Sequence, residues 1–138
     1  MTARICEFQT EGADCPGPAH KLAAKGWRQE RHALTNPDWD HFVITQPALA
    51  EALRPFLKTS LADGALPVVQ KELIVVALLA AQGYEAGVRS HANRALAAGA
   101  TAEELREALA LLIPFAGIGR YLRAAAWVEA AVDAQASD

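Results

Sequence analysis

Three kinds of side chain in the second half of this chain suit proton transfer on an organic acid: an imidazole, a carboxylate and several guanidinium groups. His91 lies in a stretch of small residues. An imidazole titrates near pH ~6.5, so it can give or take a proton at neutral pH. The residues around it favour a buried histidine that bonds a backbone carbonyl or a neighbouring acid. An acid–base role is the alternative.

Glu72 is the candidate partner of His91. The break at Gln82-Gly83 predicts that the two helices carrying these residues run antiparallel. Glu72 lies ~15 Å of helix before Gln82, and His91 lies ~9 Å into the next helix. We expect a direct bond or one bridging water between them. Such a carboxylate would orient the imidazole or act as a base, although an acid in a first helical turn is equally explained by the helix dipole.

Four arginines are candidates for holding a carboxylate, because a planar guanidinium can bind it with two parallel hydrogen bonds: Arg89, Arg94, Arg120 and Arg123. Arg89 follows Glu85 at the spacing of an ordinary surface ion pair. Arg94 shares a side of the helix with His91. Arg120 follows two glycines at a helix start, where backbone N–H groups suit anions. We therefore favour Arg94 or Arg120.

The elements that must position these residues are helices. Alanine, the best helix former, is abundant after residue 48, and β-branched residues form no long alternating runs. Apolar spacing, capping signals and Gly or Pro breaks predict helices at about 38–44, 47–62, 67–82, 85–98, 101–116 and 119–134. Pro55 should bend or split the second of these. The third is apolar nearly all round, which predicts a central, buried helix.

The organisation predicted is an all-α protein with one compact helical bundle. Residues 1–35 read as an arm that is mostly irregular with a possible short helix, and residues 36–138 as the helical domain of about five to six helices. Thr101-x-x-Glu104 is a capping box that should start one helix. Leu122, Ala126, Val128 and Val132 are expected to pack from the last helix.

Composition and charge exclude several classes of protein. The formal net charge is -3 and no basic run exists, so we expect no nucleic-acid partner. The longest apolar run, Leu73 to Ala81, is far short of the ~20 residues that span a membrane. The chain has no Cys-x-x-Cys and no ligand-type Cys/His spacing, so we expect no metal site. No secretory signal is visible, so a cytoplasmic protein is expected.

An ordered set of short motifs in the second half of the chain resembles the carboxymuconolactone decarboxylase family: Lys71-Glu72-Leu73-Ile74, Arg89-Ser90-His91, Arg94-Ala95-Leu96, Ala98-Gly99-Ala100-Thr101, Glu103 to Ala108 and Phe115-Ala116-Gly117. That family includes lactone decarboxylases of aromatic catabolism and AhpD-like alkylhydroperoxidases. The resemblance covers about half of the chain. It implies an all-helical fold, a homotrimer or homohexamer, and sites between helices and subunits.

The sequence departs from the peroxidase branch of that family at two positions. The peroxidase branch has a Cys-x-x-Cys ending four residues before the histidine, and those positions are Tyr84 and Gly87 here. A thiol cycle needs a nucleophilic and a resolving thiol, so this chemistry is disfavoured. Tyr84 is expected to donate a hydrogen bond to a ligand or to fill the space of the missing thiols. Gly119 also stands where the family often has proline.

The resemblance reverses the interpretation of His91, because His91 falls on the family's motif position. It implies a cofactor-independent decarboxylase-like enzyme for a small organic acid, an anionic lactone or unsaturated acid. His91 and Glu72 would be catalytic, and Arg94, Arg120, Arg89 and Tyr84 would bind substrate. Val88, Leu109, Ile113 and Phe115 would form an apolar pocket. The alternatives are a non-catalytic oligomeric binding protein, and a peroxidase that uses Cys6 or Cys15 of the arm.

Overall fold

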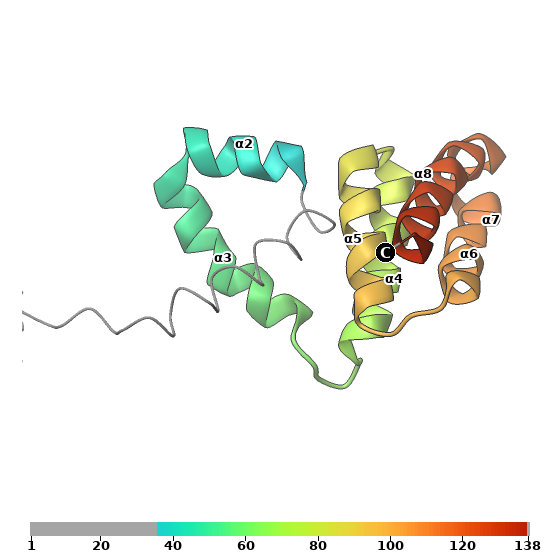
Figure 1. Ribbon diagram of the computed structural model, residues 1–138, viewed down its shortest axis with the longest axis horizontal. Helices are drawn as coiled ribbons and strands as arrows, with labels where there is room; N and C mark the ends of the chain where they lie inside the picture. Colours follow the sequence, from blue (N-terminus) through green and yellow to red (C-terminus); the bar gives the residue numbers. More distant parts are fainter. Residues whose placement is uncertain (1–35, 138) are drawn as a thin grey trace, which may run out of the picture.

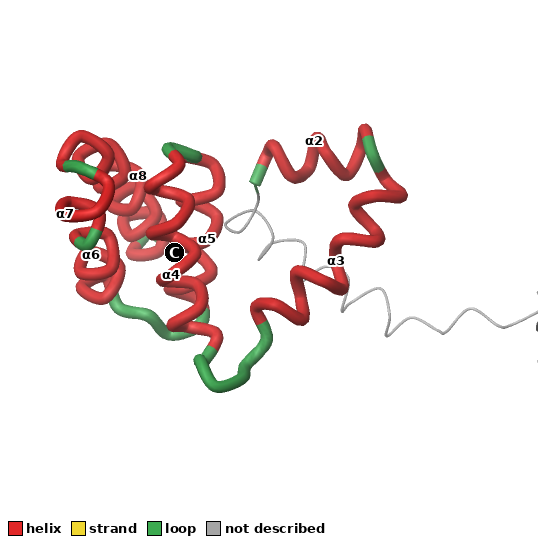
Figure 2. The backbone as a smooth tube through the Cα atoms, turned by 180° about the vertical axis from the view of Figure 1, so that it is seen from behind, coloured by secondary structure: helices red, strands yellow, loops and turns green. Residues whose placement is uncertain are grey.

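The computed structural model describes residues 36–137, and every regular element in that range is a helix (Figure 2). The expected all-α fold is confirmed. The helices are α2 (Pro37–Thr45), α3 (Pro47–Leu61), α4 (Val68–Gln82), α5 (Glu85–Ala97), α6 (Ala102–Ala110), α7 (Leu112–Ala116) and α8 (Ile118–Ala136). Only Leu111 separates α6 from α7, so these two segments form one interrupted helix. The predicted arm, residues 1–35 with both cysteines, lies outside the described residues.

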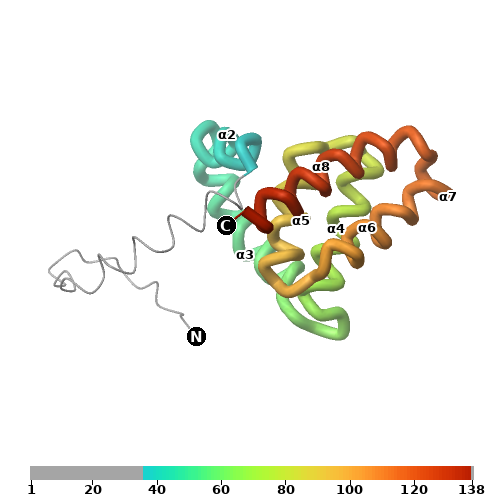
Figure 3. The backbone as a smooth tube through the Cα atoms, turned by 45° about the vertical axis from the view of Figure 1, so that its right-hand side comes forward, coloured from blue at the N-terminus to red at the C-terminus, as the bar shows by residue number. Residues whose placement is uncertain are grey.

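Helices α4 to α8 form the bundle (Figure 1). Helix α5 packs against both α4 and α8, while α6 contacts α4 and α8 from the other side, as the turned view of Figure 3 shows. Small side chains make this close packing possible, because alanines occupy much of the shared core. The buried core residues include Val76, Ala80, Val88, Ala92, Ala95, Leu105, Leu109, Ala124 and Val128.

The turn between α4 and α5 sets the antiparallel course of these two helices. Gly83 adopts a left-handed conformation with φ of 76°, which glycine enters without steric cost. Its N–H donates to the carbonyl of Ala80 at 3.0 Å, and the N–H of Tyr84 donates to the carbonyl of Leu79 at 3.0 Å. The helix break predicted at Gln82-Gly83 is confirmed, and it turns the chain straight back along α4.

The N-terminus of α6 carries the predicted capping box. Thr101 Oγ1 accepts from the N–H of Glu104 at 3.1 Å, and Glu104 Oε2 accepts from the N–H of Thr101 at 2.7 Å. Helix α6 is also joined to α8 by a two-pronged ion pair, in which Arg106 donates from Nε and Nη2 to Glu129 at 2.8 Å each. This ion pair lowers the pKa of Glu129 below its usual value.

Helices α2 and α3 form a separate V beside the bundle, and we call them the strap (Figure 1). Asn36 joins its first end to the bundle: Nδ2 of Asn36 donates to the hydroxyl of Tyr84 at 3.0 Å. At its other end, Lys71 Nζ donates to the carbonyls of Ser60 and Ala62 at 3.0 and 2.6 Å. The strap is therefore tied to the bundle at both ends.

Two sequence expectations about these helices are corrected by the structure. Of the bend or split expected at Pro55, the structure excludes the split, because α3 is one helix that runs through the proline. Helix α4 is not buried all round, because Ile74 is 46% and Leu78 57% exposed. The reason is that α5, α6 and α8 cover one side of α4, whereas the strap meets it only near the strap's end.

The last helix also packs differently from the prediction. Its buried face is Ala124, Val128 and Ala131, the spacing of one helical stripe, whereas Leu122 is 62% exposed. Ala126 is exposed as well, and Val132 is half-buried. Together with Phe115, which is 87% exposed, Leu122 leaves apolar surface at the α7–α8 end of the bundle.

No helix among residues 36–137 is both long and apolar enough to cross a membrane.

Replacing Thr101 with alanine should lower the free energy of unfolding by about 1 kcal/mol, because the change removes the acceptor that caps α6. Urea denaturation followed by circular dichroism measures it. Thr101→Ser keeps the hydroxyl and serves as the control, with a midpoint close to that of the wild type. An unchanged midpoint for Thr101→Ala would contradict the stabilising role of this cap.

Candidate functional site

His91 and Glu72 form a direct hydrogen bond between α5 and α4. Nδ1 of His91 lies 2.6 Å from Oε2 of Glu72, so no bridging water is needed. The Glu72 side chain is 5% exposed and the His91 side chain 18%. The antiparallel packing set by the Gly83 turn brings together these two residues, which are 19 positions apart in the sequence.

This bond determines which nitrogen of His91 can meet a ligand. An ionised carboxylate only accepts hydrogen bonds, so with Glu72 ionised the proton on Nδ1 faces Glu72. Nε2 is then the nitrogen that can exchange a proton with a bound molecule. The pairing also fixes the plane of the imidazole ring, which a general acid or base requires.

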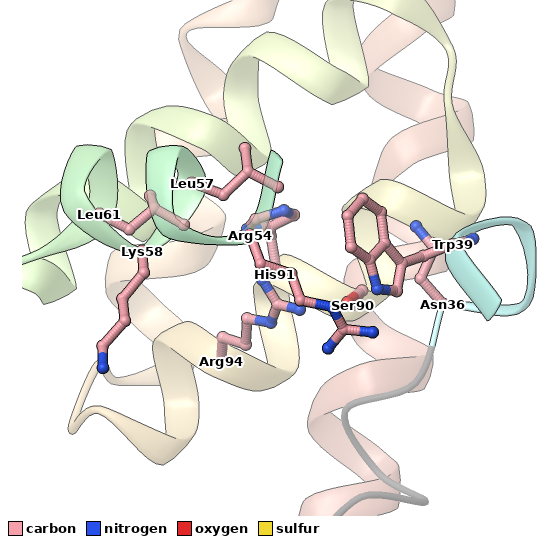
Figure 4. Close-up of a pocket in the computed structure, with 9 residues that line it drawn as sticks. All are labelled: Asn36, Trp39, Arg54, Leu57, Lys58, Leu61, Ser90, His91 and Arg94. Carbon is pink, nitrogen blue, oxygen red and sulfur yellow. The ribbon is translucent and has the colours of Figure 1, made fainter. Parts of the chain in front are cut away.

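His91 lines a cavity of about 270 Å³ between the strap and α5 (Figure 4). The residues that line it are Asn36, Trp39, Arg54, Leu57, Lys58, Leu61, Ser90, His91 and Arg94. Figure 4 shows Arg54, His91 and Arg94 gathered at its centre, with Trp39 to one side and Leu57 and Leu61 to the other. Six of these nine residues come from the strap and three from α5, so the cavity lies between the two.

The cavity has a strongly cationic lining. Arg54, Lys58 and Arg94 contribute three positive charges, and none of the described residues that line it is acidic. The carboxylate of Glu72 is hydrogen-bonded to His91 and does not line the cavity. A guanidinium binds a carboxylate through two parallel hydrogen bonds, so the lining suits a small organic anion.

Arg54 and Lys58 are the cationic site residues that the sequence analysis missed. They lie on α3, outside the motifs that carry the family resemblance. The sequence does hold a signal for these two residues. An apolar stripe at helical spacing runs along α3, formed by Leu53, Leu57 and Leu61, and Arg54 and Lys58 lie next to it. What the sequence did not contain was the path of the strap, which brings that side of α3 toward His91.

The structure brings Arg94 to His91 but places the other predicted binding residues elsewhere. Arg89 pairs with Glu85 at 3.5 Å, with both side chains half exposed. Arg120 donates to the carbonyl of Ala81, at the opposite end of α4 from Glu72. Arg89 and Tyr84 line a second cavity of about 500 Å³, together with Pro37, Asp38, Glu85 and Ala86.

The expected apolar pocket of Val88, Leu109, Ile113 and Phe115 does not form within the described part of the chain. Val88 and Leu109 are fully buried in the core. Ile113 and Phe115 are exposed, at 43% and 87%. The apolar side of the cavity beside His91 comes from Leu57 and Leu61 of α3 instead.

Tyr84 and Gly87, at the two positions where the peroxidase branch has cysteines, pack as one unit. A Cβ on Gly87 would lie 2.4 Å from Cδ1 of Tyr84, so only glycine leaves room for the ring in this position. The hydroxyl of Tyr84 is turned toward Asn36 and donates to its Oδ1 at 3.2 Å. Burial raises the pKa of Tyr84 above its usual value.

Among residues 36–137 there is no group of three or more His, Cys, Asp or Glu side chains that could hold a metal ion.

Comparisons with known proteins agree with the family resemblance. A family model described as the carboxymuconolactone decarboxylase family matches residues 47–130, more than half of the chain. An uncharacterized protein of Cupriavidus necator is 42% identical over 72 residues, which are 52% of this chain and 64% of that protein. The chain therefore spans just under two thirds of the curated relative it matches. No solved structure matches.

Replacing Glu72 with alanine should lower the free energy of unfolding by about 2 kcal/mol, because it empties a buried position and leaves the imidazole N–H without its acceptor. Glu72→Gln should cost less, since its amide oxygen can still accept from Nδ1. Urea denaturation measures both. Glu51→Ala, at an exposed glutamate of α3, is the control and should be near neutral. Equal effects of Glu72→Ala and Glu51→Ala would contradict the pairing.

Proposed function

Because the chain belongs to the carboxymuconolactone decarboxylase family, we propose that it is a cofactor-independent enzyme that acts on a small anionic lactone or unsaturated acid. The observation that carries this proposal is the His91–Glu72 bond of 2.6 Å at the wall of a cationic cavity. An oriented imidazole supplies acid–base chemistry, and the surrounding guanidinium groups supply recognition of an organic acid.

The reaction we propose is the loss of carbon dioxide from a carboxylate on a saturated carbon that lies next to the double bond of an unsaturated lactone or acid. The bond between the carboxylate and the ring breaks, and its electron pair passes into the conjugated system as CO2 leaves. Nε2 of protonated His91 then donates its proton to the resulting carbanion. Glu72 orients the ring and stabilises the imidazolium through Nδ1. Each turnover consumes one proton from solvent.

Arg54 and Arg94 are the proposed anchors for the substrate. They approach His91 from two different elements, α3 and α5, so a bound anion would lie between the strap and the bundle. Loss of a carboxylate charge is favoured where water is restricted, and Leu57 and Leu61 supply that apolar side. Arg89 and Arg120 have no part in this arrangement.

A thiol peroxidase fits the site less well. The positions that would carry the two cysteines hold the Tyr84–Gly87 packing unit, and no cysteine occurs between residues 36 and 137. Cys6 and Cys15 lie outside the described residues. The non-catalytic binding protein shares the cationic cavity, and it is the outcome if the protein binds an organic acid without turning it over.

Turnover of a carboxymuconolactone, measured as released CO2 and as proton uptake, tests the proposed reaction. His91→Gln should lower the rate by ~10²–10⁴, the usual loss when a positioned acid or base is removed. Glu72→Gln should lower it less, because that residue acts through the imidazole. His41→Gln, at an exposed histidine of the strap, is the matched control and should keep full activity.

Two results would contradict this proposal. Full turnover by folded His91→Gln would remove the acid–base role and return His91 to a structural one. Binding of the lactone without CO2 release by the wild-type protein would favour the binding protein.

We also propose that the protein assembles as a homotrimer or homohexamer. The support is the apolar surface at the α7–α8 end, where Phe115, Ile118 and Leu122 are 87%, 54% and 62% exposed. Large exposed apolar side chains at one end of a bundle favour association with further copies of the chain. Light scattering at micromolar concentration should give three or six times the chain mass of 14.7 kDa. Phe115→Asp should lower that mass and leave the helical circular dichroism intact, whereas a stable wild-type monomer would contradict the assembly.

A further inference from the structure

We propose that Tyr84 is a positioning residue of this site: through Asn36 and Trp39 of the strap it holds Arg54 at the cavity beside His91. The inference rests on the proposed function in one respect, that an organic anion enters this cavity. It assigns to Tyr84 a role other than direct contact with substrate. We call the paired side chains of Tyr84 and Asn36 the clasp.

The first step is the clasp itself. Asn36 Nδ2 donates to the Tyr84 hydroxyl at 3.0 Å, and that hydroxyl lies 3.2 Å from Asn36 Oδ1, to which it donates. The two residues are 48 positions apart in the sequence and come from the strap's first end and the start of α5. The Tyr84 ring is itself fixed, because it lies directly over Gly87.

The second step runs from Asn36 into α2. Oδ1 of Asn36 caps this helix, accepting from the N–H groups of Asp38 and Trp39 at 3.0 and 3.3 Å. The same amide therefore closes the clasp and starts the helix that presents Trp39. Both Asn36 and Trp39 line the cavity (Figure 4). Asn36 thus contacts the Tyr84 hydroxyl and also lines the cavity, so removal of the hydroxyl directly affects a residue of the cavity wall.

The third step runs from Trp39 to Arg54. The guanidinium carbon of Arg54 lies over the Trp39 ring, 6.0 Å from its centroid, which is within the range of a cation–π contact. Trp39 is also braced by Phe42, with ring centroids 5.5 Å apart. Arg54 is an exposed residue, so its side chain could take several positions. The contact with Trp39 favours the position beside His91 and Arg94.

The clasp matters because the strap has little other packing on this side of the bundle. Only Ala50 is buried among the residues of α2 and α3. Hydrogen bonds at the two ends therefore have a large share in placing the strap, and the clasp is the one at its first end. Residues 47–130 match the family model, so Asn36 and Trp39 lie before the matched region and the clasp joins it to the chain segment ahead of it.

The test compares Tyr84→Phe with Tyr121→Phe in the full-length protein. Each variant loses one phenolic hydroxyl and keeps its ring, and Tyr121 packs on the bundle core away from the cavity lining. The readout is the indole N–H resonance of Trp39 in a two-dimensional NMR spectrum. Trp39→Phe identifies that signal among the three tryptophans. Succinate, a plain dicarboxylate, is the probe for the anion site.

Tyr84→Phe should shift and broaden the Trp39 signal and raise the succinate Kd about fivefold, the effect of one lost hydrogen bond of ordinary strength. Tyr121→Phe should leave both at wild-type values. Asn36→Ser keeps a good helix cap but is too short to reach Tyr84, so it should reproduce Tyr84→Phe. The double variant should be no worse than Tyr84→Phe alone, because Tyr84→Phe already removes the contact with Asn36 together with the interaction of the hydroxyl with Asp38.

A wild-type Trp39 signal in Tyr84→Phe would overturn the proposal, as would equal shifts in Tyr84→Phe and Tyr121→Phe. A shifted signal with an unchanged succinate Kd would overturn the link from the clasp to Arg54. If succinate does not perturb wild-type Trp39, the anion site of the proposed function fails, and the Trp39 shift alone then decides the clasp. Catalytic failure of His91 variants bears on none of these readouts.

Discussion

A carboxylate that is almost completely withdrawn from water must be paired, and the position of Glu72 makes His91 the necessary partner. This bond constrains the rest of the fold. It requires α4 and α5 to lie antiparallel and close together, which the left-handed Gly83 and the alanines of the shared core allow. It also leaves one nitrogen of the imidazole for chemistry. The same interaction is therefore a stabilising contact and the reason why the ring is oriented toward the cavity.

The cationic lining is a second constraint, and it involves the strap. Three positive side chains around a cavity of about 270 Å³ repel one another. Glu72 is hydrogen-bonded to His91 and does not line the cavity. The contact of Arg54 with the Trp39 ring offsets part of that cost. A bound organic anion would offset more. The fold thus holds Arg54 and Arg94 on separate elements, and an anion is the species that would satisfy both.

Local signals in the sequence were sufficient for the helical elements and for the central pair. The Gly83 turn follows from glycine at a helix end, and the helical rise then places Glu72 opposite His91 within about one turn. The capping box at Thr101 is equally local. The arginines could not be ranked this way, because their roles depend on which element lies opposite. Arg54 lines the site because the strap folds back toward α5. Arg120 instead donates a hydrogen bond to the carbonyl of Ala81.

The Tyr84–Gly87 pair shows how a change of residue type alters what one position can do. With cysteines at both places, this turn of α5 would present two thiols beside the histidine. With tyrosine and glycine, the ring fills the space over the glycine, and the hydroxyl reaches outward to Asn36. The same backbone positions then serve the strap instead of a thiol cycle. Because the strap also carries Trp39 and Arg54, the tyrosine at this position is linked through Asn36 to the residues that line the cationic cavity.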